Sequence, residues 1–183
     1  VKKLLNYKSA GLAFCKSFLV DENNEIFGLD YDNRETEFKR ICSKSCLIPK
    51  SLASKFLMHS CIMPNLSGIL FRKKCFNEVG FFPENFVACS DWVIFFKIAK
   101  LYDFYFENKT LNFFRQHRKT IRSSMNQKET LDEFFKLLFT ELSDNHFLKN
   151  NKKEFRIHIM YLWITYLTNL RESTLIFFFH HLK

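Results

Sequence analysis

The spacing of apolar residues changes near Ser124, and this change limits the folds that the chain can adopt. Before it, apolar residues come in short runs bounded by polar residues, as in Ala10–Val20 and Ile69–Phe71, which is typical of β-strands. After it, they recur at helical spacing, as do Leu131, Phe134, Phe135, Leu138 and Leu142. The sequence therefore predicts an α/β protein, with a mixed sheet and helices in residues 1–124 and a helical C-terminal extension in residues 125–183.

The beginning of the chain predicts a pair of strands joined by a turn. An apolar run with β character covers Ala10–Val20, and a turn composition follows at Asp21–Asn24. A second, shorter strand is expected over residues 25–29. Residues 30–50 are polar and charged, and they predict a surface loop with a short helix.

Later segments predict two helices of the α/β part and three helices of the extension. The strand at Ile69–Phe71 leads into a helix that should end at Gly80. A second helix should open with Ser90 as a hydroxyl N-cap and Asp91 in the first turn. Extended segments are expected at 102–106 and 111–117, and extension helices near 131–142, 155–170 and 174–182.

Composition limits the size of the core and the kind of partner. The 183 residues are 47% hydrophobic, enough for one core of ordinary size. Lys and Arg number 28 against 19 for Asp and Glu, and the net charge of +9 favours anionic partners such as nucleotides or an anionic membrane surface. No apolar stretch reaches the ~20 residues of a membrane span. We expect a cytoplasmic protein, soluble or peripheral on the inner face of the cell membrane.

The six cysteines are scattered through the first half of the chain and do not have the dense spacing of a secreted disulfide scaffold. Cys42-x3-Cys46, followed by His59 and Cys61, has some of the residue types of a zinc site. Closely spaced C-x2-C pairs are absent, however, so ordinary thiols in a reducing compartment are the favoured interpretation.

Four ordered blocks between Asn65 and His117 resemble glycosyltransferase family 2, whose members share the GT-A fold. The blocks are Asn65–Lys73, Val79–Glu84, Ser90–Trp92 and Phe114–His117. The resemblance implies a bacterial enzyme that transfers a sugar, with inversion, from a nucleotide-sugar donor to a glycan or lipid-linked acceptor in cell-surface polysaccharide biosynthesis. It also implies that this chain is the acceptor-side part and lacks the N-terminal nucleotide-binding half.

By this resemblance, Asp91 is the catalytic base that removes the proton of the acceptor hydroxyl. A carboxylate within hydrogen-bonding reach provides this general-base help to a poor nucleophile. The family usually has an acidic residue before this position, where the chain has Ser90. The alternative is that Asp91 merely opens a helix, because the helix dipole favours a negative charge there.

The resemblance also implies donor- and acceptor-binding residues. Trp92 would stack on a sugar, although an aromatic residue in an apolar helix is often part of the core. Arg115 would neutralise phosphate charge. An ordinary turn would explain Asn65, Ser67 and Gly68 nearly as well, and a solvated strand end would explain Arg115. The expected binding residues are Asn65, Ser67, Gly68, Arg72, Trp92 and Arg115.

The family uses Mn²⁺ or Mg²⁺ held mainly by an Asp-x-Asp motif, and His117 matches a histidine that often reaches this metal. Asp30-Tyr31-Asp32 has the letters of that motif. The segment before it resembles the family region that follows the true motif, so we expect Asp30 and Asp32 to be decoys. The main metal ligands would then lie outside this chain.

Other classes of function compete with the transferase. The structural alternative is a non-catalytic remnant, or a module that binds an acceptor or a partner chain at the membrane surface. Residues 177–183 suit either an interfacial helix or a helix docked on the core. The basic cluster near Arg118 and Arg122 would suit nucleic acid, but an RNA-binding pattern is lacking, so a nucleic-acid partner is not favoured.

Overall fold

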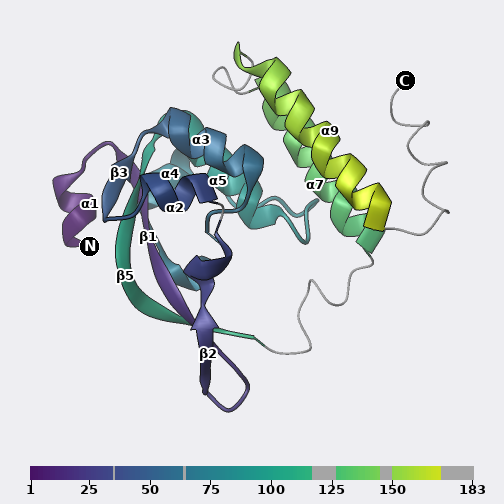
Figure 1. Cartoon of the computed structure of the whole chain (residues 1–183). Helices are drawn as coiled ribbons and strands as arrows, with labels where there is room; N and C mark the ends of the chain where they lie inside the picture. Colours follow the sequence, from purple (N-terminus) through teal and green to yellow (C-terminus); the bar gives the residue numbers. More distant parts are fainter. Residues whose placement is uncertain (35, 64, 117–126, 145–149, 170–183) are drawn as a thin grey trace.

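The computed structural model describes residues 1–34, 36–63, 65–116, 127–144 and 150–169. They form an α/β structure in which a five-stranded mixed sheet carries helices, followed by two long helices that lie side by side (Figure 1). This confirms the expected α/β class with a mixed sheet and a helical C-terminal part. None of the described helices is long and apolar enough to cross a membrane.

The sheet is built around its first strand. β1 (Ala10–Val20) pairs in parallel with β5 (Asp103–Arg115) along one edge. Along its other edge it pairs with two short antiparallel strands, β4 (Ile69–Phe71) and β2 (Ile26–Leu29). β3 (Cys46–Ile48) pairs antiparallel with the outer edge of β5. β1 and β5 therefore form the centre of the sheet.

The pairing of β1 with β5 is interrupted in the middle. Cys15 lies opposite Glu107, but the next residue, Lys16, lies opposite Thr110, so β5 carries extra residues there. Such a bulge bends the strand and changes which way the following side chains point. Beyond it, Asn112 lies opposite Ser17, so the side chains of these two residues can meet.

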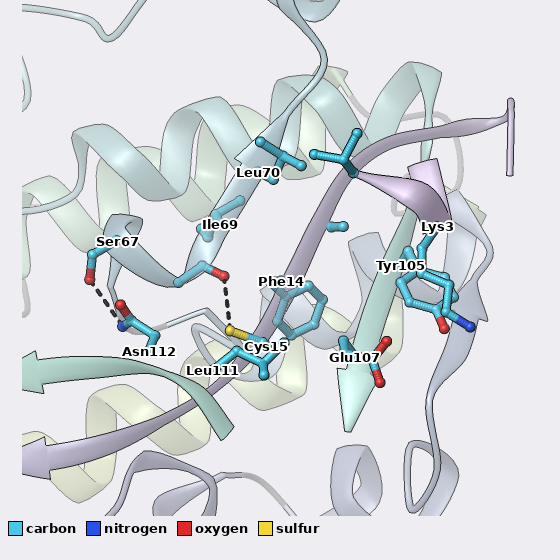
Figure 2. Close-up of a pocket in the computed structure, with 13 residues that line it drawn as sticks. Lys3, Phe14, Cys15, Ser67, Ile69, Leu70, Tyr105, Glu107, Leu111 and Asn112 are labelled. Carbon is cyan, nitrogen blue, oxygen red and sulfur yellow. Dashed lines mark hydrogen bonds between the residues drawn. The ribbon is translucent and has the colours of Figure 1, made fainter. Parts of the chain in front are cut away.

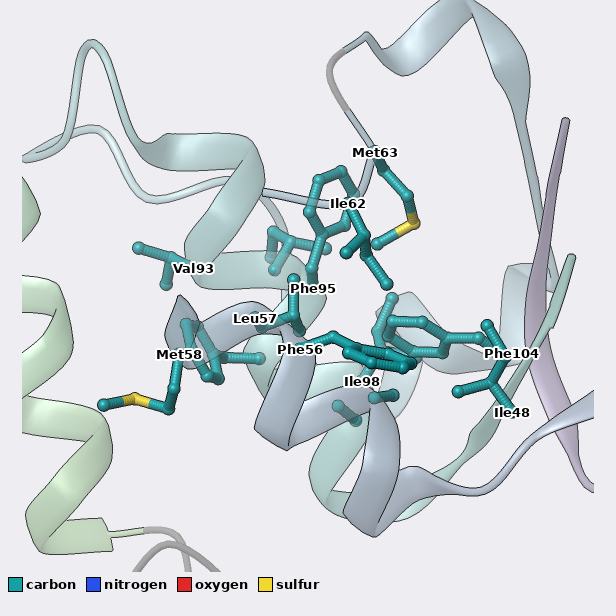
Figure 3. Packing of buried hydrophobic residues seen from close by; sticks show 14 of the residues in the cluster. Ile48, Phe56, Leu57, Met58, Ile62, Met63, Val93, Phe95, Ile98 and Phe104 are labelled. Carbon is teal, nitrogen blue, oxygen red and sulfur yellow. The ribbon is translucent and has the colours of Figure 1, made fainter. Parts of the chain in front are cut away.

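The main core lies between one face of the sheet and the helices α3 (Lys50–His59) and α5 (Ser90–Leu101) (Figure 3). Aromatic residues supply much of it, and burying each of them removes a large apolar area from water. Fully buried aromatic residues of this core are Phe38, Phe56, Phe95, Phe96, Phe104, Phe106 and Phe155.

The opposite face of the sheet carries a smaller cluster. The short helix α1 (Lys2–Asn6) places Leu4 against Ala10 and Tyr105. The Arg72 side chain fixes this N-terminal segment, because its guanidinium donates to the main-chain carbonyls of Leu4, Tyr7 and Ala10.

The helices α7 (Gln127–Asp144) and α9 (Lys152–Asn169) share the main core rather than forming a separate one. Phe135 and Leu138 of α7 and Phe155 and Ile159 of α9 are buried in the same cluster as α3 and α5. These two helices correspond to the first two expected in the extension. The third, expected over 174–182, lies outside the described residues.

α9 is apolar on two sides. Phe155, Ile159 and Trp163 face the core cluster. Four further apolar residues at positions one helical turn apart are exposed to solvent and form what we call the outer stripe of α9: Ile157, Met160, Tyr161 and Ile164.

Several elements match the sequence predictions closely. β1 has the predicted bounds, and α4 (Lys73–Val79) ends at Gly80. Gly80 has φ = 80°, a left-handed backbone conformation in which a side chain would be strained.

Other predictions were wrong in detail. Residues 30–50 are not simply a loop with one helix, because they contain the 3-10 helix η1 (Asp30–Asn33), α2 (Thr36–Ile41) and the strand β3. Ser90 is the first residue of α5 rather than its N-cap, which is Cys89 and makes no capping bond with its side chain. The two extended segments expected around 102–117 form the single strand β5.

Candidate functional site

A cluster of small polar side chains joins β1, β5 and the short 3-10 helix η2 (Leu66–Gly68). The Asn112 amide group lies 3.0 Å from both the Ser17 hydroxyl and the Asn65 side-chain oxygen, and 3.1 Å from the Ser67 hydroxyl. The Asn65 amide group in turn donates to Ser17 at 3.2 Å. The structure thus brings together two predicted binding residues, Asn65 and Ser67, with two that sequence reasoning missed, Ser17 and Asn112.

The local sequence explains how Asn65 and Gly68 reach this arrangement. Asn65 is the N-cap of η2, and its side-chain oxygen accepts from the Gly68 N–H at 2.9 Å and from the Ser67 hydroxyl at 2.8 Å. This is the usual role of Asn at a helix start. A Cβ at Gly68 would lie 3.3 Å from the Asn65 oxygen and 3.5 Å from the Ser17 hydroxyl. Glycine therefore lets η2 lie close against the sheet.

A cavity of about 260 Å³ opens beside this cluster (Figure 2). Its wall includes Ser67, Gly68 and Asn112, together with residues of β1, β4, β5 and α1. The Cys15 thiol also lines it and lies 3.6 Å from the Gly68 carbonyl oxygen, which it faces as a weak donor. Burial raises the pKa of the Cys15 thiol above its usual value, so at neutral pH this side of the cavity is uncharged.

The other end of the cavity is lined by charged and aromatic groups. Lys3 and Tyr105 lie there with Glu107 (Figure 2). A hydrogen bond with Tyr105 raises the pKa of Lys3, so its ammonium group stays charged. Glu107 accepts a hydrogen bond of 2.6 Å from Ser45. The cavity therefore offers a cation and a carboxylate at one end, and neutral donors and acceptors at the other.

Asp91 and Trp92 do not line this cavity. Asp91 is half-buried in the first turn of α5, and its carboxylate accepts a hydrogen bond of 2.7 Å from the Trp92 main-chain N–H. The Trp92 ring packs against Phe134 of α7, with 5.0 Å between ring centroids. The structure therefore shows Trp92 packed against the core, which is the alternative to a sugar-stacking role.

The loop before Asp91 is held by a residue that sequence reasoning missed. The Glu133 carboxylate of α7 accepts hydrogen bonds from three consecutive main-chain N–H groups, those of Val87 and Ala88 at 2.8 Å and of Cys89 at 3.1 Å. A carboxylate at this place satisfies donors at the helix start and is favoured by the helix dipole. Because Glu133 is 44 residues from Cys89 in the chain, no local sequence signal could have shown this contact.

Arg72 and Arg115, the two predicted binding arginines, are engaged in main-chain contacts. The guanidinium of Arg72 is bound to the N-terminal segment, as described above. Arg115 is exposed and donates to the carbonyls of Asp21 and Glu22 at 3.1 and 3.2 Å, and to the Asn24 side chain. It therefore closes the turn between β1 and β2. His117, the predicted metal ligand, lies outside the described residues.

Asp30 has a structural role. Its buried carboxylate lies 3.0 Å from the guanidinium of Arg34, which is also buried, and accepts the Ser17 N–H at 2.9 Å. Asp32 is exposed. A carboxylate that is already paired with an arginine does not fit the role of a metal ligand. Among the described residues, no group of three or more His, Cys, Asp or Glu side chains is placed to hold a metal ion.

Comparisons of the chain with protein-family models, curated proteins and solved structures gave no match.

Proposed function

We propose that the chain is the acceptor-side part of an inverting glycosyltransferase of the GT-A type, similar to glycosyltransferase family 2. It would transfer a sugar from a nucleotide-sugar donor to a glycan or lipid-linked acceptor in cell-surface polysaccharide synthesis. In this proposal Asp91 is the general base.

The observation that carries the proposal is the placement of Asp91 within the ordered sequence blocks. The block containing Asn65 and Gly68 forms η2 and β4, and the block containing Asp91 opens α5. The carboxylate of Asp91 is half-buried rather than fully buried, so a substrate hydroxyl can approach it. Glu133 fixes the loop that precedes it, and a fixed base avoids the cost of being oriented during the reaction.

The proposed chemistry follows from these groups. Asp91 takes the proton of the acceptor hydroxyl as its oxygen attacks the anomeric carbon of the sugar. The nucleotide diphosphate leaves from the opposite face, and the anomeric configuration is inverted. Mn²⁺ or Mg²⁺ would neutralise the diphosphate, but the described residues do not supply its ligands, so we assign no step of this chain to the metal.

A second function is favoured by the position of the cavity. Ser67, Gly68 and Asn112 line it but Asp91 does not, and this separation suits a module that binds an acceptor or a partner without catalysing transfer. A volume of about 260 Å³ is slightly below the ~300 Å³ of the smaller ligand pockets, so a single small ring or head group is the appropriate size of ligand.

One experiment separates the two functions. The native polypeptide that contains this sequence is incubated with a panel of labelled nucleotide-sugars and with glycan and lipid-linked acceptors, and transfer and nucleotide release are both measured. Transfer with release of a nucleotide diphosphate supports the glycosyltransferase. Acceptor binding that needs no nucleotide-sugar, without any transfer, supports the binding module. Salt-sensitive binding to anionic vesicles alone would instead favour a membrane-surface role.

A further inference from the structure

The cavity beside the polar cluster is lined by two opposite charges that are not paired with each other. The Lys3 ammonium and the Glu107 carboxylate both line it, and neither takes part in the ion pairs formed between described residues. We propose that the cavity binds a free α-amino acid, whose carboxylate lies against Lys3 and whose ammonium group lies against Glu107. This proposal goes beyond the transferase function and does not depend on it.

Lys3 lies on a helix that is fixed to the sheet. Leu4, the next residue of α1, is buried against Ala10 and Tyr105. Arg72 binds main-chain carbonyls of the same segment. The Lys3 ammonium lies over the Tyr105 ring, 5.6 Å from the ring centroid, and this contact helps to hold the charge at the cavity. An ammonium group has three donors and no acceptor, so it binds the carboxylate of the ligand.

Glu107 is held by the turn that precedes β3. Its Oε1 accepts the Ser45 hydroxyl at 2.6 Å, and the Ser45 oxygen accepts the Asn108 N–H at 2.9 Å. Among the described residues, no other hydrogen bond to this carboxylate is formed. Its second oxygen is therefore left to accept from the ammonium group of the ligand, and a hydrogen bond between two charged groups is stronger than one between neutral groups.

An α-amino acid suits this pair because both of its charged groups are attached to one carbon atom. A neutral ligand would leave both charges of the cavity without a partner. A ligand with only an anionic group would bring it close to Glu107, and one with only a cationic group would bring it close to Lys3, so like charges would repel. A zwitterion is complementary to both charges.

The rest of the cavity fits an uncharged side chain. Figure 2 shows Ser67, Leu111 and Asn112 on the side away from Lys3. The Asn112 N–H groups are directed at the polar cluster, which leaves its side-chain oxygen as an acceptor. Leu70 and Leu111, which are 42% and 67% exposed, add an apolar wall. The amide and methylene groups of glutamine match these surroundings.

Analogues of glutamine test the two charges without changing the protein. Glutamine is titrated into the native polypeptide in the absence of nucleotide-sugar, and binding is followed by NMR. We expect saturable binding with a dissociation constant on the order of 1 mM. Glutamine α-amide, which lacks the carboxylate, and N-acetylglutamine, which lacks the ammonium group, should each bind roughly 3- to 10-fold more weakly. Each of them loses one charged contact at a partly exposed site.

Variants assign each charge of the ligand to its partner. Lys3→Met should weaken glutamine binding roughly 3- to 10-fold and remove the preference for glutamine over its α-amide. Glu107→Gln should remove the preference for glutamine over N-acetylglutamine. Lys2 is exposed on the same helix and does not line the cavity. Lys2→Met is therefore the matched control and should bind glutamine as the wild type does.

Three results would overturn the proposal. They are the absence of saturable binding at roughly 20 mM glutamine, equal binding of glutamine and its two blocked analogues, and equal weakening by Lys2→Met and Lys3→Met. The assay needs no sugar transfer. A polypeptide that transfers sugar without binding glutamine would contradict the amino-acid site alone, and one that binds glutamine without transferring sugar would contradict the transferase alone.

Discussion

At the scale of single residues, a buried ion pair connects η1 to the central strand β1. The Asp30–Arg34 pair is almost completely buried and ties η1 to β1 through the Ser17 N–H. The Arg34 guanidinium also donates to the Cys61 carbonyl at 3.4 Å. Burial lowers the pKa of Arg34, and the Asp30 charge opposes this shift, as expected for a charge kept in the interior by its partner.

The first prediction follows from this pair. Arg34→Met should lower the free energy of unfolding by about 3–5 kcal/mol, because it leaves the Asp30 carboxylate buried without its partner. Urea denaturation of both proteins measures the change. Asp32→Asn, two residues away but exposed, is the control and should change stability by less than ~0.5 kcal/mol. Equal losses of unfolding free energy in the two variants would mean that the buried Asp30 carboxylate does not depend on Arg34 as its partner.

At the scale of elements, the start of α5 depends on a residue from another helix. Ser90 has the residue type of an N-cap, yet the N–H groups before it are bound by Glu133. The carboxylate thus links α7 to the loop that precedes Asp91. Hydrogen bonds to a charged acceptor are stronger than those between neutral groups.

The second prediction concerns this link. Glu133→Gln should lower the free energy of unfolding by about 1–3 kcal/mol, since the charged acceptor of three N–H groups is lost. Hydrogen exchange at Val87, Ala88 and Cys89 should become faster. The neighbouring Asp132 is exposed, and Asp132→Asn serves as the control. Unchanged exchange at these three amides in Glu133→Gln would contradict the role given to Glu133.

The elements that could be predicted are those encoded by contiguous residues. β1 is a largely apolar run interrupted only by Lys16 and Ser17, and α4 is followed by a glycine with a left-handed conformation. β3 could not be predicted, because it lies in a polar, charged stretch of the sequence and its pairing with Phe104–Phe106 joins distant parts of the chain.

The same distinction holds for the candidate site. Asn65, Ser67 and Gly68 are close in sequence, and the turn that they form was predictable. Ser17 and Asn112 join them from 48 and 47 residues away from Asn65, respectively. Their contact depends on the bulge in β5, for which the sequence has no recognisable signal.

At the scale of the whole molecule, the long helices belong to the main core on one side and face solvent on the other. Ile159 of α9 is 3% exposed, whereas Ile164 in its outer stripe is 52% exposed. The same residue type on opposite sides of one helix gives a matched comparison of the two faces.

The third prediction uses this comparison. Ile159→Ala should lower the free energy of unfolding by about 2–5 kcal/mol, because it leaves a cavity in the core. Ile164→Ala should lower it by less than ~1 kcal/mol in dilute protein, since the side chain is already half in water. Denaturation curves at low protein concentration test both. Equal losses would show that α9 does not pack on the core through the Ile159 side.

The glycosyltransferase proposal concerns the molecule as a whole and depends most on Asp91. The measurement that tests it directly is the rate of sugar transfer by the Asp91→Asn variant of the native polypeptide, with Asp32→Asn as the control. We expect transfer to fall by about 10²–10⁴-fold through loss of the general base, with the thermal unfolding midpoint unchanged and Asp32→Asn fully active. Transfer at the wild-type rate by Asp91→Asn would contradict the account.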